Sequence, residues 1–208
     1  MIELFLSAFI TLFVVIDPPG CAPIYASLTT GASVQERRSM AARAVVIAAG
    51  ILLLFAFVGR PLLHVLGIGL DAFRIAGGIM LFFIALEMVF ERRTQRRESR
   101  AKKIEETPEV EDVSVFPMAM PMIAGPGSIA TIMLLMAQAQ GGVQRGMVLG
   151  ALALNLLLML GSLLLAGPLM RLVGERIEAV ITRVLGVLLA ALAVQFVLDG
   201  VRGAFMTP

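Results

Sequence analysis

The feature that most constrains this chain is a series of six long apolar stretches, each of the length that a helix needs to cross a bilayer. A hydrocarbon core of about 30 Å requires roughly 20 apolar residues in a helix. Hydrophobic residues make up 59% of the 208 positions and charged residues only 15%, and a soluble domain of this length cannot bury so much apolar surface. The sequence therefore predicts an all-α polytopic membrane protein with six transmembrane helices, at about residues 3–28, 40–58, 65–90, 113–138, 146–170 and 177–201.

The first and fourth stretches are each interrupted near the middle by helix-breaking residues. Proline lacks an amide hydrogen and clashes with the preceding turn, and glycine resists helical order. Backbone groups freed in this way are costly in hydrocarbon, so they are tolerated only inside protein or beside a watery cavity. We name these segments the first break, Asp17-Pro18-Pro19-Gly20, and the second break, Ala124-Gly125-Pro126-Gly127-Ser128.

A shift of 107 residues aligns the second half of the chain with the first. Under this shift uncommon residues meet their own kind: Pro19-Gly20 and Pro126-Gly127, Arg38 and Arg145, Pro61-Leu62 and Pro168-Leu169. Each half contains three spans, and an odd number means that the second half enters the membrane from the opposite face. The sequence thus predicts a single membrane domain over 1–208, an inverted 3+3 repeat of 1–90 and 113–208 joined by a charged cytoplasmic linker, 91–112. Inverted repeats with one discontinuous helix in each half recur in secondary transporters.

The basic residues are divided unequally between the two sides of the predicted membrane. With Arg183 included, thirteen Lys and Arg lie on the side of the 91–112 linker and four on the other. Cytoplasmic loops carry such an excess, so we expect an inner (cytoplasmic) membrane location with both termini outside the cytoplasm. The linker has seven basic and seven acidic residues and is interpreted as a solvated connection or a partner-docking segment. A formal net charge of +2 gives no indication of nucleic-acid binding, and Glu3 stands where a signal peptide would be positive.

Asp17 is the residue of the first break that most suggests function. An ionisable group inside a span is expensive and is a functional candidate. Fourteen residues beyond Glu3, at about 1.5 Å each, it lies roughly 21 Å into the membrane. We expect it to orient a solute's ammonium group or to carry a coupling proton. The alternative is a cap on the helix that resumes at Cys21, because Asp before two prolines is also good N-cap chemistry.

Other polar residues in the spans support this site or simply join helices. Arg183 is expected at a depth comparable to that of Asp17 and in contact with it, and Arg74 level with the carbonyls of the second break. For both arginines the alternative is snorkelling to an interface. Side-chain hydrogen bonds to a solute, or between helices, are available from Ser128, Thr131, Asn155 and Gln195.

No set of residues typical of catalysis or of a cofactor occurs in the chain. There is no nucleophile elbow, no HExxH and no glycine-rich phosphate loop, so we expect no enzyme activity and no cofactor. Cys21 is the single cysteine and His64 the single histidine, which leaves no metal-binding pattern. The pair Gly146 and Gly150 would allow close helix packing or a homo-oligomer.

Four motifs together resemble those of the MarC-type family of six-span integral membrane proteins, grouped within a superfamily of amino-acid exporters. The resemblance covers essentially the whole chain, and its carriers are DPPGCAPIY (17–25), FRIAGGIMLF (73–82), FPMAMPMIAGPGSIATIM (116–133) and the segment 171–200. It implies an inner-membrane protein, with some relatives transporting small neutral amino acids such as glycine and alanine. Many relatives have Asn where this chain has Cys21. The substrate- or ion-binding set that we expect is Asp17, Pro18, Gly20, Cys21, Pro23, Gly125, Pro126, Gly127 and Ser128, supported by Arg74, Arg183 and Asn155.

The function that these observations favour is secondary transport of a small polar solute by alternating access. Neutral amino acids (Gly, Ala, Ser) are the expected solutes, with a proton or Na⁺ as coupling ion and the lipid bilayer as surroundings. One alternative is an exporter of amino acids or toxic compounds. The other is an integral membrane protein that transports nothing, although such a protein has no need of a break in both halves.

Overall fold

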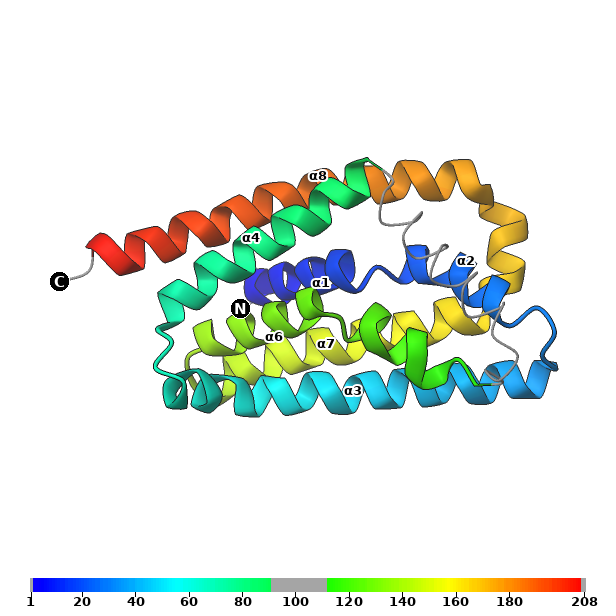
Figure 1. Cartoon of the computed structure of the whole chain (residues 1–208), viewed down its shortest axis with the longest axis horizontal. Coiled ribbons are helices and arrows are strands. Elements are labelled where there is room, and N and C mark those ends of the chain that lie inside the picture. The colour runs from blue at the N-terminus through cyan, green and yellow to red at the C-terminus, as the bar shows by residue number, and fades with distance from the viewer. Residues whose placement is uncertain (1, 91–111, 207–208) are drawn as a thin grey trace.

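A computed structural model describes residues 2–90 and 112–206, with the backbone alone at 169–176 and 178. Within these ranges every regular element is a helix, as the sequence predicted, and Figure 1 shows them as one elongated bundle. Five segments are long and apolar enough to cross a membrane, or six if η1 and α6 form one span. The elements are α1 (Ile2–Ile16), α2 (Pro18–Leu28), α3 (Val34–Val65), α4 (Leu70–Val89), η1 (Ser114–Ile123), α6 (Pro126–Gln138), α7 (Gly141–Leu164) and α8 (Ala166–Met206).

Local sequence signals account for the ends of α3. Its start is fixed by a capping box, in which Ser33 and Glu36 each bond the other's backbone amide, an arrangement that satisfies two orphan donors at once. Its end is followed by Gly67, whose φ of 69° turns the chain back toward α4. Glycine adopts this left-handed conformation without steric cost. The two signals therefore fix where α3 begins and where it ends.

Most of the packing joins the two halves of the chain rather than the helices within one half. Helix α4 lies along α8, α1 and α2 pack on α7, and α3 packs on η1 and α6. Figure 1 shows that the paired helices α4 and α8 run in opposite directions, and so do α3 and α7. Close approach of α4 to α8 depends on glycine, since a Cβ on Gly78 would lie 2.7 Å from the carbonyl oxygen of Ala193. The two halves of the chain therefore pack on each other through most of their helices.

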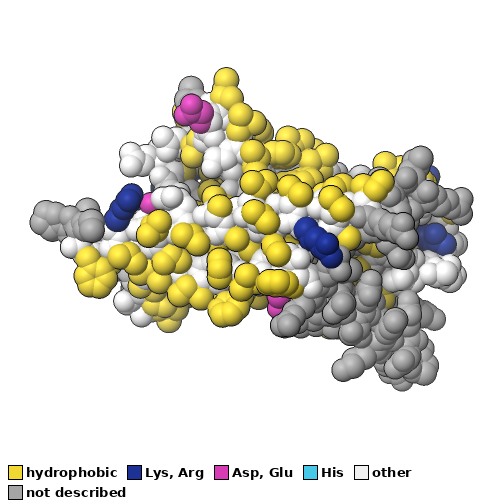
Figure 2. Space-filling view, turned by 90° about the horizontal axis from the view of Figure 1, so that it is seen from above, with side chains coloured by type: hydrophobic (Ala, Val, Ile, Leu, Met, Phe, Trp, Pro, Cys, Tyr) yellow, Lys and Arg dark blue, Asp and Glu magenta, His cyan; other side chains and the backbone are white. Residues whose placement is uncertain are grey.

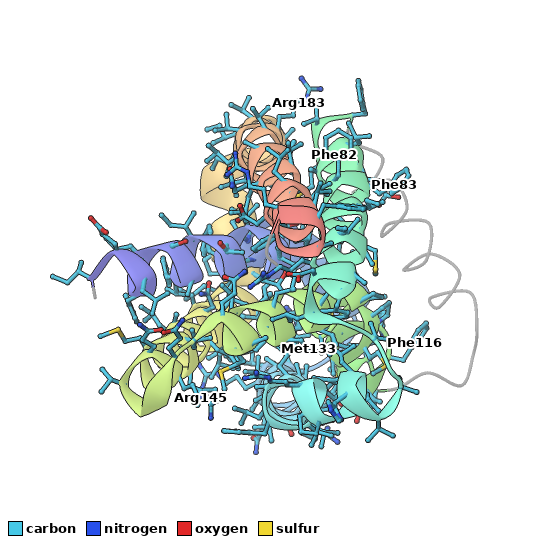
Figure 3. All side chains as sticks on the ribbon, turned by 90° about the vertical axis from the view of Figure 1, so that its left-hand side faces the viewer. Phe82, Phe83, Phe116, Met133, Arg145 and Arg183 are labelled. Carbon is cyan, nitrogen blue, oxygen red and sulfur yellow. The ribbon has the colours of Figure 1, made fainter. Side chains whose placement is uncertain are left out.

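The outer faces of the helices are strongly apolar. Figure 2 shows apolar side chains spread over the face formed by α4 and α8. Phe83 is 63% exposed and Phe57 is 61% exposed, and Figure 3 shows Phe83 and Phe116 pointing away from the bundle. Surfaces of this kind suit contact with lipid, where apolar groups need no burial in protein.

The boundary between the last two helices differs from the prediction. We expected a fifth span to residue 170 and a loop before 177, but α7 ends at Leu164 and α8 begins at Ala166. The reason is Pro168, which falls in the first turn of α8, where its missing amide hydrogen costs nothing. The Gly167-Pro168 pair thus starts a helix instead of ending one. Figure 1 shows these first turns crossing the end of the bundle before α8 runs back along α4.

The segment before the second break is also more irregular than predicted. We expected helix from residue 113 to the break, but η1 has wide, π-type turns and leaves helical geometry at Phe116 (φ −128°, ψ 126°) and Met120 (φ −135°, ψ 126°). Each of these residues precedes a proline, Pro117 or Pro121, and proline forces the residue before it toward extended backbone. Of the charged linker 91–112, only Asp112 lies within the described residues, where it pairs with Arg43 at 2.8 Å.

Candidate functional site

The first break centres on Asp17, which separates α1 from α2. Its backbone is left-handed, with φ 58° and ψ 64°, a conformation that Asp and Asn tolerate better than most other residues with a Cβ. The side chain is 1% exposed, and its Oδ1 accepts a hydrogen bond from the amide of Gly20 at 3.1 Å. Pro18 is the first residue of α2, the position that proline favours in a helix. Asp17 is therefore an N-cap, and it is also a carboxyl group buried in the bundle.

Gly20 leaves room for this carboxylate. A Cβ on Gly20 would lie 2.3 Å from Asp17 Oδ2 and 2.9 Å from its Cγ, so only glycine fits beside the acid as it stands. Pro18 and Pro19 offer no amide hydrogen, and the amide of Gly20 turns to Asp17. The carbonyls of Val14 and Ile16 consequently lack the donor that a regular helix would supply four residues further on. One of them, the Ile16 carbonyl, accepts a hydrogen bond from the buried Cys21 Sγ at 3.7 Å.

The second break is formed by the end of η1 and the start of α6, which are bent by 53° relative to each other. Gly125 caps α6 in extended backbone without a side-chain hydrogen bond, and Pro126 is the first residue of the helix. A Cβ on Gly125 would lie 2.4 Å from the carbonyl oxygen of Pro121. Of this break, Pro126 alone is exposed; Ala124, Gly125, Gly127 and Ser128 are buried.

The end of α1, next to the first break, meets the second break inside the bundle. A Cβ on Gly127 would lie 3.3 Å from Val15 Cγ1, just before Asp17, and 2.5 Å from Ile84 Cδ1 of α4. Helices α1 and α6 also pack on each other directly. Val15 and Gly127 are both buried, so the contact between the end of α1 and the second break is made within protein and not on the outer surface.

The other predicted polar residues lie in the surrounding helices. Asn155, fully buried in α7, donates through Nδ2 to the Phe9 carbonyl at 3.1 Å and to the Ala151 carbonyl at 2.9 Å. Its Oδ1 is buried without a hydrogen-bond partner, as is Thr131 Oγ1 in α6. Asn155 therefore ties α7 to α1 about two turns before the first break. Pro23 stands inside α2 and is half-buried.

The two predicted arginines do not take the positions that we expected. Arg74 pairs with Asp71 of its own helix at 2.8 Å, and its stem packs over Gly200 of α8, so it serves the α4–α8 contact and not the carbonyls of the second break. Arg183 is exposed, and Figure 3 shows its side chain pointing away from the bundle. This placement argues against the Asp17–Arg183 contact. Snorkelling of Arg183, the alternative for that residue, fits its exposure.

Two cavities that we did not predict lie at opposite ends of the bundle. One, of about 270 Å³, is bounded by the end of α2, the start of α3 and the α7–α8 junction. The other, of about 220 Å³, is bounded by the ends of α3 and α6 and the start of α7. Arg38 lines the first and Arg145 the second. The sequence signal for these cavities is the 107-residue shift, because it aligns Arg38 with Arg145.

Comparison with known proteins decides the family. The model of the MarC family integral membrane proteins matches residues 2–205. The chain belongs to the MarC family. Similar relatives include a "UPF0056 membrane protein" of Methanocaldococcus jannaschii, 37% identical over 99% of both chains. Others are the UPF0056 membrane protein YvbG of Bacillus subtilis, 34% identical over 99% of this chain and 97% of the relative, and YhcE of Escherichia coli, 32% identical over 95% and 91%. No solved structure matches the chain.

The MarC family match settles the membrane character of the chain over nearly its whole length and fits the long apolar helices. Within residues 2–90 and 112–206, no three His, Cys, Asp or Glu side chains gather as a metal site. The chemistry available at the two breaks is therefore that of one buried carboxyl group, backbone carbonyls and the start of α6.

Proposed function

We propose that this MarC-family protein is a secondary transporter of a small polar solute that works by alternating access around the two breaks. The observation that carries the proposal is the buried contact between Val15 at the end of α1, two residues before the buried Asp17, and Gly127 of the second break. A carboxyl group inside an apolar bundle is costly and is retained mainly where it binds or conducts. Interrupted helices that meet in the protein interior are how many transporters build a binding site near the midplane.

The proposed architecture is an inverted repeat in which α1–α2, α3 and α4 correspond to η1–α6, α7 and α8. The packing pattern supports it, because exchanging the halves maps each main pairing onto another one. The pairing of α1–α2 with α7 becomes that of η1–α6 with α3, and the α4–α8 pairing maps onto itself. The opposite directions of α4 and α8 agree with this mapping. Rocking of one half against the other would then open the site to each face in turn.

The chemistry at the breaks suits a zwitterion. Asp17, with backbone carbonyls at the end of α1, would receive an ammonium group, or Asp17 would carry the coupling proton. The start of α6, which has no side-chain cap, would attract a carboxylate through its amides and helix dipole. Small neutral amino acids such as glycine, alanine and serine have both groups, and the family resemblance implies the same class.

The proposed setting is the cytoplasmic membrane, with the basic loops inside and both termini outside. Figure 1 places the start of α1 and the end of α8 in the same half of the bundle, which fits an even number of spans. Arg37, Arg38 and Arg43 begin α3 at the end opposite Arg60, so the side with more arginines would face the cytoplasm.

The test is uptake of labelled glycine, alanine and serine into proteoliposomes, with and without a pH or Na⁺ gradient. We expect saturable, gradient-dependent uptake of at least one of them, and efflux from preloaded vesicles when the gradient is reversed. Measuring both directions distinguishes an importer from an exporter. If none of the three moves in either direction, while a known transporter does in the same vesicles, the proposal for these solutes is wrong.

A further inference from the structure

The two end cavities are equivalent under the shift that aligns the two halves of the sequence. Of the eight residues that line the cavity at α6, seven lie 107 residues from a residue that lines the cavity at α2. The matched pairs include Arg38 with Arg145, Pro168 with Pro61, and Leu164 with Phe57. The shift comes from the sequence and the cavities come from the fold, so their agreement is an independent observation. We call them the α2 cavity and the α6 cavity.

Both cavities are positively charged. Arg37 and Arg38 line the α2 cavity, and Arg60 and Arg145 line the α6 cavity. Among the described lining residues of either cavity none is acidic. Arg60 has no arginine counterpart in the α2 cavity, since the matched position is Gly167, and Arg37 is likewise matched by Gln144. Each cavity therefore has two arginines in its lining. One arginine of each cavity stands at a matched position, Arg38 or Arg145, and the second one, Arg37 or Arg60, stands at an unmatched position.

In each cavity one of the two matched arginines, Arg38 or Arg145, is exposed. At the α2 cavity, Arg37 is bound to the carbonyls of Ala32 and Thr30 at 3.0 and 3.4 Å, and Tyr25 donates its hydroxyl to the Arg37 carbonyl. Arg37 thus fixes the wall, whereas Arg38 is exposed. At the other end Arg145 is exposed as well, and Figure 3 shows Arg145 and Met133 on neighbouring helices of that end.

We propose that the α2 and α6 cavities are symmetry-related mouths of one pathway on opposite membrane faces, and that Arg38 and Arg145 receive the anionic oxygen group of the entering solute. This rests on the proposed transport function and adds its entry sites. Volumes of about 270 and 220 Å³ lie below the roughly 300–1,000 Å³ of pockets for drug-sized ligands, so a small solute with a carboxylate is the ligand class. The phosphate of a lipid headgroup shares this chemistry, and the test separates the two.

The experiment uses cysteines at the matched positions Phe57 and Leu164, one in each cavity. Both side chains are exposed, at 61% and 45%, so Phe57→Cys and Leu164→Cys should preserve the fold. The background is Cys21→Ser, which keeps a donor for the Ile16 carbonyl. Matched controls are Val58→Cys and Leu165→Cys, which are the next residues, are again related by 107, and line neither cavity. Each is treated with methanethiosulfonate reagents of equal length that bear either a sulfonate or a trimethylammonium group, in right-side-out and inside-out vesicles.

The expected result has two parts. Phe57→Cys and Leu164→Cys should each react from one face only, and those faces should be opposite. At both positions the sulfonate reagent should be favoured over the cationic one by about fivefold or more relative to the controls, with the preference reduced at high salt, because each cavity contains positive charge. Arg38→Gln should lower the preference at Leu164→Cys alone, and Arg145→Gln at Phe57→Cys alone.

Each other outcome overturns the proposal in a defined way. Reaction of both cysteines from the same face, or no charge preference at either, removes the paired mouths. A preference seen in detergent but lost in vesicles assigns the arginines to lipid phosphate instead. None of these readouts requires transport, so charge-selective cavities on opposite faces combined with failed uptake would refute the proposed solutes while leaving the anion-attracting mouths in place.

Discussion

Val15 Cγ1 lies 3.3 Å from the point that a Cβ on Gly127 would occupy, so residues separated by more than half of the chain bring the end of α1 against the second break. This contact belongs to the α1–α6 packing, which joins the halves of the molecule. Because the Val15–Gly127 contact is buried, a substitution that disturbs it should change the free energy of unfolding.

Gly127→Val should destabilise the protein, and Val15→Ala should partly restore it. A valine at position 127 cannot be accommodated by rotating Ile84 alone, since Val15 is also close to the new side chain. Such overpacking typically costs about 1–3 kcal/mol. In a double-mutant cycle read by thermal unfolding in detergent, we expect the two substitutions to be coupled by about 0.5–3 kcal/mol. Gly146→Val, at a position with no atom within 4 Å, is the control. Additive effects would mean that Val15 and Gly127 are not in contact.

Gly20→Ala tests whether the Asp17 carboxylate occupies the space beside Gly20. The new methyl group would overlap Oδ2 of Asp17, so the carboxylate must move and lose its hydrogen bond from the Gly20 amide. We expect a loss of about 1–3 kcal/mol in unfolding free energy. Gly50→Ala in α3, with no atom within 4 Å, should instead gain about 0.5–1 kcal/mol. An equal gain at both positions would show that the Asp17 carboxylate points elsewhere.

The sequence predicted the helical class, and its Pro and Gly residues mark the places where α1 gives way to α2 and η1 to α6. It did not predict the left-handed backbone of Asp17, because two prolines after an acid also suit an ordinary N-cap. The irregular turns of η1 were within reach, since Pro117 and Pro121 each restrict the residue before them. Their effect was missed because the long apolar pattern from residue 113 outweighed it.

The arginine positions show what hydropathy alone leaves out. Depth in the membrane placed Arg74 and Arg183 near the breaks, but depth does not fix which side of a helix faces the core. Asp71 stands three residues before Arg74, a spacing at which side chains pair on a helix, and that pairing was readable from the sequence. The exposure of Arg183 depends on how α8 turns against α4, which is a property of the packed fold.

Asn155 is expected to act as a connection between helices. Asn155→Leu removes the hydrogen bonds to Phe9 and Ala151 but keeps a similar volume, and polar contacts of this type in membranes are worth about 0.6 kcal/mol on average and 1.7 at most. Asn155→Asp should cost more, because a carboxylate cannot donate to two carbonyl oxygens. Thermal unfolding measures both changes, and solute affinity should stay within about twofold of the wild-type value for the leucine variant. A large loss of affinity with intact stability would place Asn155 in the solute site instead.

Asp17→Asn separates the two roles of Asp17, since asparagine retains the cap and the left-handed backbone but removes the charge. Asn caps helices about as well as Asp and also tolerates positive φ, so we expect stability within about 0.5 kcal/mol of the wild-type protein. Transport should fall by about tenfold or more, because a hydrogen bond to a charged group contributes about 1.5–3 kcal/mol and 1.4 kcal/mol is a factor of ten. Any acid limb in the pH dependence of uptake should disappear. Asp71→Asn, which removes an acid paired with Arg74 at the start of α4, is the matched control and should keep that limb. Wild-type rate and pH dependence in Asp17→Asn would reduce Asp17 to a helix cap and remove the charged group from the proposed site.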